Sequence, residues 1–215
     1  MNKKNLFGFS SLSDYAVSKY GQKPTRNPLR PVYIKPRATP KEKSDYGFYP
    51  SPPEVVKELI NLADIKPHHK VLEPSAGHGI ILDEIKKLTS SFICGELLKE
   101  NCDVLESKGY TVSFNDFLKW NDDSFDRIIM NPPFFQQGDL YHVLHAFKLL
   151  KRGGRLVSVM SNGVTFRDNH KTADFRELLK NNGYIKSLPH NSFKESGTSV
   201  KTVIIVLDKP NEIKT

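Results

Sequence analysis

The segment Arg127–Leu140 reads RIIMNPPFFQQGDL, and it predicts both a strand and the point where that strand ends. Its first residues, RIIM, form a short apolar run of the kind that fills the middle of a sheet. Pro132 and Pro133 then remove two backbone donors and force Asn131 into an extended conformation, so the strand must stop there. In an open α/β sheet, ligands bind at the carboxyl ends of the strands. The segment therefore predicts an amide, a carbonyl and an aromatic ring at a binding edge.

The sequence on both sides of this segment predicts an alternating α/β fold. Helical patterns cover residues 54–63, 80–88, 98–109, 139–154 and 172–183, and strand patterns cover residues 70–79, 91–97, 110–117, 124–130, 155–161, 184–190 and 199–209. We expect Ser51 to cap the first helix, and Gly153-Gly154 to cap the helix at 139–154. Strands that alternate with helices of about ten residues imply βαβ units. We therefore expect one α/β domain whose mainly parallel sheet has helices on both faces.

The net charge of +8 lies entirely in the first fifth of the chain. Residues 1–43 hold 10 lysines and arginines against 2 acidic residues, whereas the remaining residues hold 22 of each. Five prolines interleave with basic residues over residues 23–43, so this segment cannot form a helix or an interior strand. It is either a solubilising tail or a flexible arm that tracks nucleic-acid phosphates, with Tyr20 and Tyr33 available for stacking.

Composition predicts a soluble, cytoplasmic protein with one substantial domain. The chain has 215 residues, of which 38% are hydrophobic, and no run approaches the length of about 18 apolar residues that a membrane span needs. The N-terminus lacks the continuous apolar core of a signal peptide. Cys94 and Cys102 have no metal-ligand spacing, and no metal site is expected. We divide the chain into a basic arm at residues 1–43, a domain at residues 44–210 and a tail at residues 211–215.

The first predicted strand leads into a turn with two glycines, EPSAGHG at residues 73–79. Glycines at this position let the backbone pass close to a ligand, and the following helix offers free N–H groups at its N-terminus. The third glycine of the dinucleotide fingerprint is missing, which counts against NAD. Glu73 opens the turn, and its carboxylate suits a cationic or amino-bearing ligand rather than a pyrophosphate.

The next two strands also end in polar residues. Glu96 follows the second strand, 17 residues after Gly79, where an acidic residue can accept hydrogen bonds from both ribose hydroxyls. Asn115, Asp116 and Phe117 end the third strand, and together they suit an adenine through its exocyclic amine and its ring face. A ribose, an adenine and a positively charged amino-acid-like group together describe S-adenosyl-L-methionine.

The tetrapeptide Asn131-Pro132-Pro133-Phe134 suits a substrate amino group. The Asn131 side-chain oxygen and the Pro132 carbonyl can both accept hydrogen bonds from such a group, which orients its lone pair and stabilises the positive charge that develops during methyl transfer. Phe134 offers a ring on which a planar base or amide stacks. No general base is needed before transfer, because the nitrogen becomes acidic only after it gains the methyl group.

Over about residues 45–209, the sequence resembles class I S-adenosylmethionine-dependent methyltransferases, in particular those that act on adenine N6. The segments VLEPSAGHG, CGELLKE, FNDFL and MNPPFF match the family's cofactor loop, ribose-binding acid, adenine contact and catalytic tetrapeptide, in the family's order. The resemblance implies a Rossmann-like sheet of seven strands with an antiparallel last strand. The segments LYHVLHAFKLLKRGGRLVSVMS and FKESGTSVKT further resemble small adenine methyltransferases of phages and mobile elements.

The same resemblance assigns roles to individual residues. Cofactor contacts fall on Phe48, Tyr49, Ser51, Pro52, Glu73, Pro74, Ser75, Ala76, Gly77, Gly79, Glu96, Asn115, Asp116, Phe117 and Asn131. Catalysis falls on Asn131, Pro132, Pro133 and Phe134. Phe134 and Phe193 are assigned to the target base, Phe193 by its position between the last two strands.

These observations favour a site-specific DNA adenine N6-methyltransferase. The alternatives are methylation of an RNA base, at adenine N6 or guanine N2, and a non-catalytic subunit that keeps the fold for binding. The separate target-recognition region that restriction-system enzymes carry is missing from this sequence, so the basic arm or a partner subunit would have to supply affinity for nucleic acid. A base in a duplex would have to be flipped out to reach Asn131, whereas a single strand avoids that cost.

Overall fold

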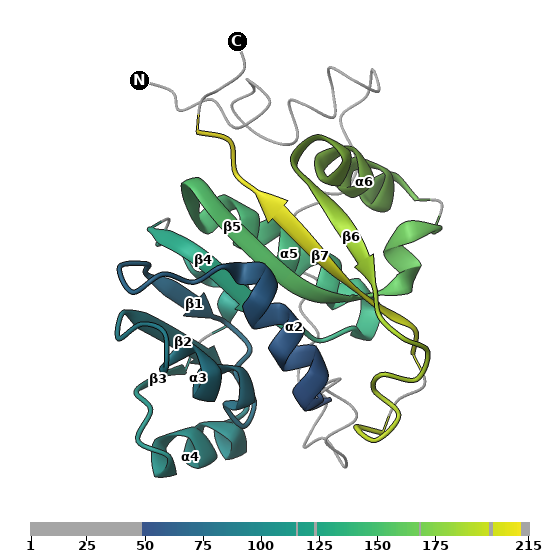
Figure 1. Cartoon of the computed structure of the whole chain (residues 1–215). Coiled ribbons are helices and arrows are strands. Elements are labelled where there is room, and N and C mark those ends of the chain that lie inside the picture. The colour runs from purple at the N-terminus through teal and green to yellow at the C-terminus, as the bar shows by residue number, and fades with distance from the viewer. Residues whose placement is uncertain (1–48, 115, 123, 168, 198–199, 212–215) are drawn as a thin grey trace. The chain divides into compact units, whose positions relative to one another are not determined.

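The computed structural model describes residues 49–211, except residues 115, 123, 168, 198 and 199 (Figure 1). Its α-helices are α2 (Pro53–Ala63), α3 (Ile80–Ile85), α4 (Lys99–Ser107), α5 (Gly138–Leu149) and α6 (His170–Asn182). Its strands are β1 (Val71–Glu73), β2 (Phe92–Glu96), β3 (Val112–Phe114), β4 (Phe125–Met130), β5 (Leu150–Ser161), β6 (Gly183–Ser187) and β7 (Thr202–Asp208). Short 3-10 helices are η2 (Phe117–Lys119), η3 (Phe135–Gln137) and η4 (Asn162–Thr165). The described residues fall within one compact unit, residues 39–211.

The strands form one seven-stranded sheet in the order β3-β2-β1-β4-β5-β7-β6. The pairs from β3 to β5 are all parallel, whereas β7 is antiparallel to both β5 and β6. The predicted fold class, a mainly parallel sheet with an antiparallel last strand, is therefore confirmed. Because β1 to β4 occupy adjacent positions, their carboxyl ends meet at one edge of the sheet, which is where ligands bind in such folds.

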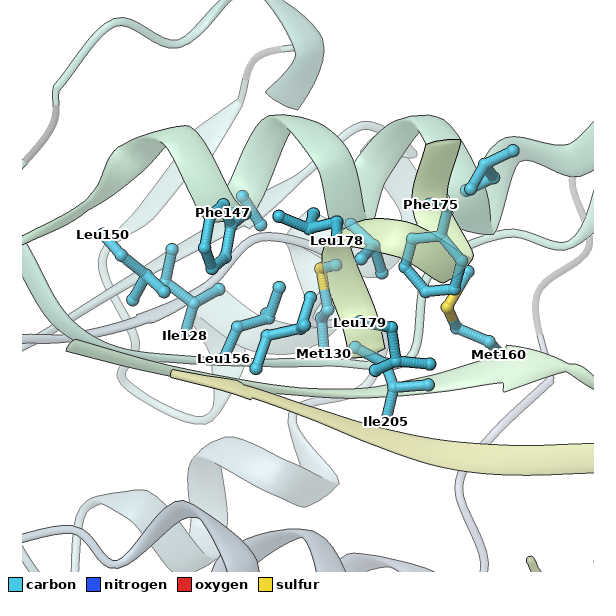
Figure 2. Close-up of a cluster of buried hydrophobic side chains, with 14 of the residues drawn as sticks. Ile128, Met130, Phe147, Leu150, Leu156, Met160, Phe175, Leu178, Leu179 and Ile205 are labelled. Atoms are coloured by element: carbon cyan, nitrogen blue, oxygen red, sulfur yellow. The ribbon is translucent and has the colours of Figure 1, made fainter. Parts of the chain in front are cut away.

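Two hydrophobic cores lie on opposite faces of this sheet, because successive side chains of a strand point to opposite sides. In β4, Ile128 and Met130 join the core beneath α5 and α6, whereas Ile129 joins the core beneath α2 and α3. In β7 the alternation repeats, with Ile205 in the first core and Ile204 in the second. Figure 2 shows the first core, where Phe147, Phe175, Leu178 and Leu179 of the helices meet Ile128, Met130, Leu156, Met160 and Ile205 of the strands.

Two predicted helix caps are wrong. Pro52 occupies the N-cap position of α2 without a side-chain cap, and the Ser51 hydroxyl instead accepts a hydrogen bond from Asn131. Helix α5 ends at Leu149, before Gly153-Gly154, and its next residue is already extended. The ammonium of Lys209 donates to the carbonyls of Lys148 and Leu150, so a lysine from beyond β7 satisfies the end of this helix in place of a glycine cap.

We expect Phe175→Ala to lower the free energy of unfolding by about 3–5 kcal/mol, because the Phe175 ring is fully buried between α6 and the sheet. Phe166→Ala is the control, because that ring is 70% exposed and its loss should change stability by less than about 0.5 kcal/mol. Urea denaturation of both variants checks the prediction. Equal losses in the two variants would contradict the packing shown in Figure 2.

Candidate functional site

The glycine turn after β1 is held in a tight left-handed path. Gly77 and Gly79 have φ angles of 55° and 80°, which residues with a side chain rarely adopt. A Cβ atom added to Gly79 would also lie 2.8 Å from the Leu105 side chain of α4. The amide of Ala76 donates to the Gly95 carbonyl at 3.0 Å, which ties the turn to β2. The turn therefore has the tight left-handed shape that its two glycines predict, although the amides of Ala76, Gly77 and Gly79 already have acceptors within the protein. Its contact with a ligand stays a prediction.

The Glu96 carboxylate links this turn to the end of β2. One oxygen accepts from the Gly77 amide, and the other accepts from the amides of Leu97 and Leu98, each at 2.8 Å. An ionised carboxylate has about four acceptor positions, so these three bonds leave about one position for a ligand. The predicted contact with both ribose hydroxyls would require one of the amides to give up its place. That ribose contact stays a prediction.

Glu73 is a buried acid beside the glycine turn. It is 1% exposed, and its Oε2 atom has no hydrogen-bond partner in the part of the chain described here. Burial raises the pKa of Glu73 well above its usual value, and the negative charges of Glu96 and Asp83 raise it further. A cationic amino group placed beside this oxygen would favour the ionised carboxylate and satisfy the unpaired atom. The residue therefore fits the predicted role of holding an amino-bearing cofactor.

Asn131, directly after β4, is oriented by the segment that precedes α2. Its Nδ2 atom donates to the Tyr49 carbonyl at 2.9 Å and to the Ser51 hydroxyl at 3.1 Å. Since a carbonyl oxygen can only accept, the group that faces Tyr49 must be the amide nitrogen. The Asn131 side-chain oxygen is then the end left to accept hydrogen bonds, as the predicted contact with a substrate amine requires. The sequence did not reveal that Tyr49 and Ser51 hold this amide.

The turn that follows Phe134 is strained and pinned from two sides. Gln136 and Gln137 both have positive φ angles, 50° and 63°, which is unfavourable for residues with a side chain. A Cβ atom added to Gly138 would lie 2.6 Å from the Pro133 carbonyl oxygen, so α5 starts against the tetrapeptide at residues 131–134. Asp139 is fully buried, and its carboxylate accepts from the Ser161 amide at the end of β5 at 2.8 Å. These contacts fix the tetrapeptide between two adjacent strands.

Three of the predicted aromatic residues, Tyr49, Phe134 and Phe193, lie on one core, whereas Phe117 belongs to the core on the other face of the sheet. Phe193 is 1% exposed and lies in the core beneath α2, and Tyr49 and Phe134 pack against the same core. The Ser196 hydroxyl donates to the Pro50 carbonyl at 2.7 Å, which joins the loop between β6 and β7 to the segment before α2. Phe193 is covered in this arrangement, so its contact with a target base requires this loop to move and stays a prediction.

The residues after β3 are organised around Phe117. The Asp116 carboxylate caps η2 by accepting from the Leu118 amide at 3.1 Å. The Phe117 ring is 4% exposed and meets the rings of Trp120, His142 and His145 edge-on, with centroids 5.0–6.1 Å apart. The two histidines are thus packing residues. The predicted adenine contacts of Asp116 and Phe117 are not tested.

The remaining predicted site residues that the structure describes are buried or half-buried. Pro74, Ala76 and Pro132 are buried, whereas Pro52, Ser75 and Pro133 are half-buried. Phe48 and Asn115 lie outside the described residues. Within residues 49–211, apart from the five positions not described, no group of histidine, cysteine and acidic residues could hold a metal ion. In the same part of the chain, every helix is too short or too polar to cross a membrane.

Two residues with structural roles at the site carry no sequence signal. Lys108, at the C-terminal end of α4, donates to the His78 carbonyl at 2.9 Å and to the Asp83 carboxylate at 2.7 Å, which secures the glycine turn. Asp139 falls in a helical pattern among polar neighbours, where an acidic residue is ordinarily exposed. Its anchoring contact with Ser161 depends on β4 and β5 being adjacent, and only the fold reveals that.

The fold is similar to that of solved methyltransferases. A modification subunit of a putative type I restriction enzyme from Vibrio vulnificus YJ016 superposes with a TM-score of 0.64 and 22% identity, over 78% of this chain and 46% of that one. A putative RNA methyltransferase from Pyrococcus horikoshii superposes with a TM-score of 0.61 and 21% identity, over 82% of this chain and 93% of that one. At this level of identity the likeness shows the fold alone.

Part of the sequence is similar to one family of methylases. Residues 110–215 match the family model described as N-6 DNA Methylase. The Type II methyltransferase M.CvrRI of Paramecium bursaria Chlorella virus XZ-6E is 31% identical over 46% of this chain and 27% of its own length. The Type II methyltransferase M.HincII of Haemophilus influenzae is 27% identical over 46% of this chain and 19% of its own length. The matched region thus spans less than a third of the length of these relatives. The predicted resemblance to N6-adenine methyltransferases is confirmed by the family match.

We expect Glu73→Gln to remove a pH-dependent loss of stability. Because the pKa of Glu73 in the folded protein lies well above that of an exposed glutamate, the folded state holds this proton at pH values where the unfolded state has lost it. The free energy of unfolding of the wild type therefore falls as the pH rises from the unfolded-state pKa of Glu73 to its folded-state pKa. The Glu73→Gln variant should not show this fall. Urea denaturation from about pH 4.5 to about pH 8 checks this, with the exposed Glu106→Gln as control. Parallel pH profiles for wild type and Glu73→Gln would contradict a raised pKa of the buried Glu73 carboxyl.

Proposed function

We propose that this chain methylates the exocyclic N6 amino group of adenine in DNA. The orientation of Asn131 carries the proposal, because an amide held by Tyr49 and Ser51 presents only its oxygen as an acceptor at the end of β4. The match to the N-6 DNA Methylase family and to two Type II methyltransferases supports adenine in DNA as the target.

S-adenosyl-L-methionine, the cofactor of this family, would supply a methyl group on a positively charged sulfur. Glu73, the turn at Gly77–Gly79 and Glu96 would hold it. The Asn131 oxygen and the Pro132 carbonyl would accept the two amino hydrogens of the base and point the nitrogen lone pair at the methyl group. They would also stabilise the positive charge that the nitrogen gains until it loses a proton. Phe134 would stack on the base.

We assign target recognition to two sources beside the described residues. The structural neighbour from Vibrio vulnificus is titled a modification subunit, which supports a partner subunit as one source. The second source is the basic segment at residues 1–43 of this chain, which we propose to be an arm. A cytoplasmic location is also part of this proposal.

RNA methylation is the second candidate, supported by the Pyrococcus horikoshii neighbour, of which the aligned region spans 93%. A methyl-transfer assay with labelled S-adenosyl-L-methionine on duplex DNA, single-stranded DNA and total RNA decides between the candidates. Digestion and mass analysis should give N6-methyladenine from a DNA pool. Label in RNA alone would overturn the DNA assignment, and cofactor binding without any label would favour a non-catalytic subunit.

We expect Asn131→Ala to lower methyl transfer by at least a hundredfold while the dissociation constant for S-adenosyl-L-methionine changes by less than about threefold. The Asn131 oxygen would stabilise charge that develops on the substrate nitrogen, and loss of one such contact costs about 10²–10³ in rate. Single-turnover assays and calorimetry check the two halves. Ser51→Ala is the matched control, because it removes one of the two contacts on the amide but keeps the oxygen. A large loss of cofactor affinity in Asn131→Ala would contradict this role.

We expect deletion of residues 1–43 to weaken DNA binding and to flatten its dependence on salt, because that segment carries a net charge of +8. Fluorescence anisotropy with labelled DNA between about 50 and about 200 mM salt measures both effects. A salt slope equal to that of the full chain would return residues 1–43 to the role of a solubilising tail.

A further inference from the structure

Two phenylalanines stand exposed on neighbouring loops beside the catalytic tetrapeptide. Phe166, after η4, is 70% exposed, and Phe135, directly after Phe134, is 49% exposed. Single exposed apolar side chains are ordinary on a protein surface, but two large aromatic rings beside a candidate active site form a candidate contact surface. Their neighbours Arg167, Asn169 and His170 are also exposed. We call these five residues the phenylalanine rim.

The two loops that carry the rim lie side by side. β4 and β5 are adjacent and parallel, so the segments that follow them leave the same edge of the sheet. The Asn169 amide donates to the Gln137 side chain at 3.5 Å, and the Lys171 ammonium donates to the Tyr141 hydroxyl. The start of α6, which directly follows the η4 loop, therefore contacts both η3 and α5. Phe135 also lies four residues after Asn131, which places it within about 15 Å of the catalytic amide.

The exposure of Phe166 is imposed by a firmly held loop. The Arg176 guanidinium of α6 donates to the carbonyls of Val164 and Arg167, at 3.4 and 2.8 Å. The Thr172 hydroxyl also donates to the Arg167 carbonyl at 2.8 Å, and the Arg167 amide donates to the Gly163 carbonyl at 2.9 Å. The backbone on both sides of Phe166 is therefore fixed while its ring faces solvent, which is the form of a preformed contact.

The chemistry of the rim fits one class of ligand. Unpaired nucleobases stack on aromatic rings whatever their sequence, and a nearby arginine attracts the phosphates between them. In the sequence, residues 162–171 carry Arg167 and Lys171 against the single acidic residue Asp168, so the segment is weakly basic. The Asn169 amide already caps α6 and contacts Gln137, so Arg167 is the polar group that the rim offers to a ligand.

We propose that the phenylalanine rim binds unpaired DNA bases next to the target adenine, with Phe166 as the main stacking platform and Arg167 on the adjoining phosphate. This inference rests on the proposed function, since it supplies strand contacts for the same catalytic site. It gives the described domain its own contact with the substrate, in addition to any contribution from residues 1–43 or a partner. The contact is independent of base identity, so it contributes affinity and positioning rather than sequence recognition.

The test measures the affinity of the full chain for a fluorescein-labelled single-stranded oligonucleotide that contains adenine. We expect Phe166→Ala to weaken binding at least fivefold and Phe166→Trp to stay within twofold of wild type, because stacking needs a ring. Tyr184→Ala is the matched control, because Tyr184 is an aromatic residue of β6 with 47% exposure away from the rim. Its affinity should equal that of wild type.

Arg167→Gln tests the phosphate contact separately. Loss of one phosphate contact to a single strand should reduce the slope of log affinity against log salt by about 0.7. The dissociation constant for S-adenosyl-L-methionine, measured on every variant, should not change. Thermal unfolding confirms that the exposed substitutions leave the fold intact.

Affinity in Phe166→Ala equal to that in Tyr184→Ala would overturn the rim proposal. So would a wild-type dimer that Phe166→Ala dissociates without any change in DNA affinity, because the ring would then bind a second copy of the chain. The proposed function fails in a different way. If the wild-type chain binds DNA through Phe166 but never methylates it, the proposed function is wrong and the rim proposal holds. If Phe166→Ala methylates DNA and binds it with wild-type affinity, the rim proposal is wrong and the proposed function holds.

Discussion

The position of β4 in the middle of the sheet is the constraint on which the rest of the structure depends. The strand is hydrogen-bonded on both sides, to β1 and to β5, and its side chains alternate between the two cores. A strand buried in this way cannot slip by one residue without exchanging its two faces. Asn131 comes directly after its last residue, so the register that fills both cores also sets the height of the Asn131 amide at the sheet edge.

Backbone amides, rather than basic side chains, hold the carboxylates of Glu96 and Asp139. Glu96 accepts from three amides and joins the ends of β1 and β2, while Asp139 joins the start of α5 to the end of β5. Amides on ordered strands and loops cannot turn away as a lysine does, so each carboxylate is fixed in direction as well as charge. This arrangement requires the Asp139 carboxylate to be buried. Burial raises the pKa of Asp139, and the hydrogen bonds with Ser161 lower it in part.

Much of the fold was predictable because its signals are local. The apolar run before Asn131, the prolines that stop it and the glycine turn at residues 73–79 each follow from backbone chemistry, and the order of strands and helices follows from periodicity. The wrong helix caps share one cause. Ser51 and the glycines after α5 are good capping residues by type, but tertiary partners were available at both ends: Asn131 bonds the Ser51 hydroxyl, and Lys209 reaches the carbonyls near the end of α5.

Residues whose roles depend on distant segments could not be predicted. Nothing near Asp139 in the sequence indicates that its carboxylate reaches Ser161, and nothing near Phe193 indicates a ring that is covered in the absence of a base. The same holds for Tyr49, whose backbone carbonyl, not its ring, contacts Asn131. A backbone carbonyl is present in every residue, so a sequence motif cannot record which one is used.

The place of β7 has a consequence for how the chain folds as it is synthesised. β7 inserts between β5 and β6, although it is made after both, and it contributes fully buried side chains to each core. Until Thr202–Asp208 leaves the ribosome, β5 has an unpaired edge and β6 has no neighbour among the described strands. The nascent protein therefore carries an open sheet edge and two incomplete cores in the interval between the synthesis of β5 and that of β7, which is when such edges recruit chaperones or pair with other chains.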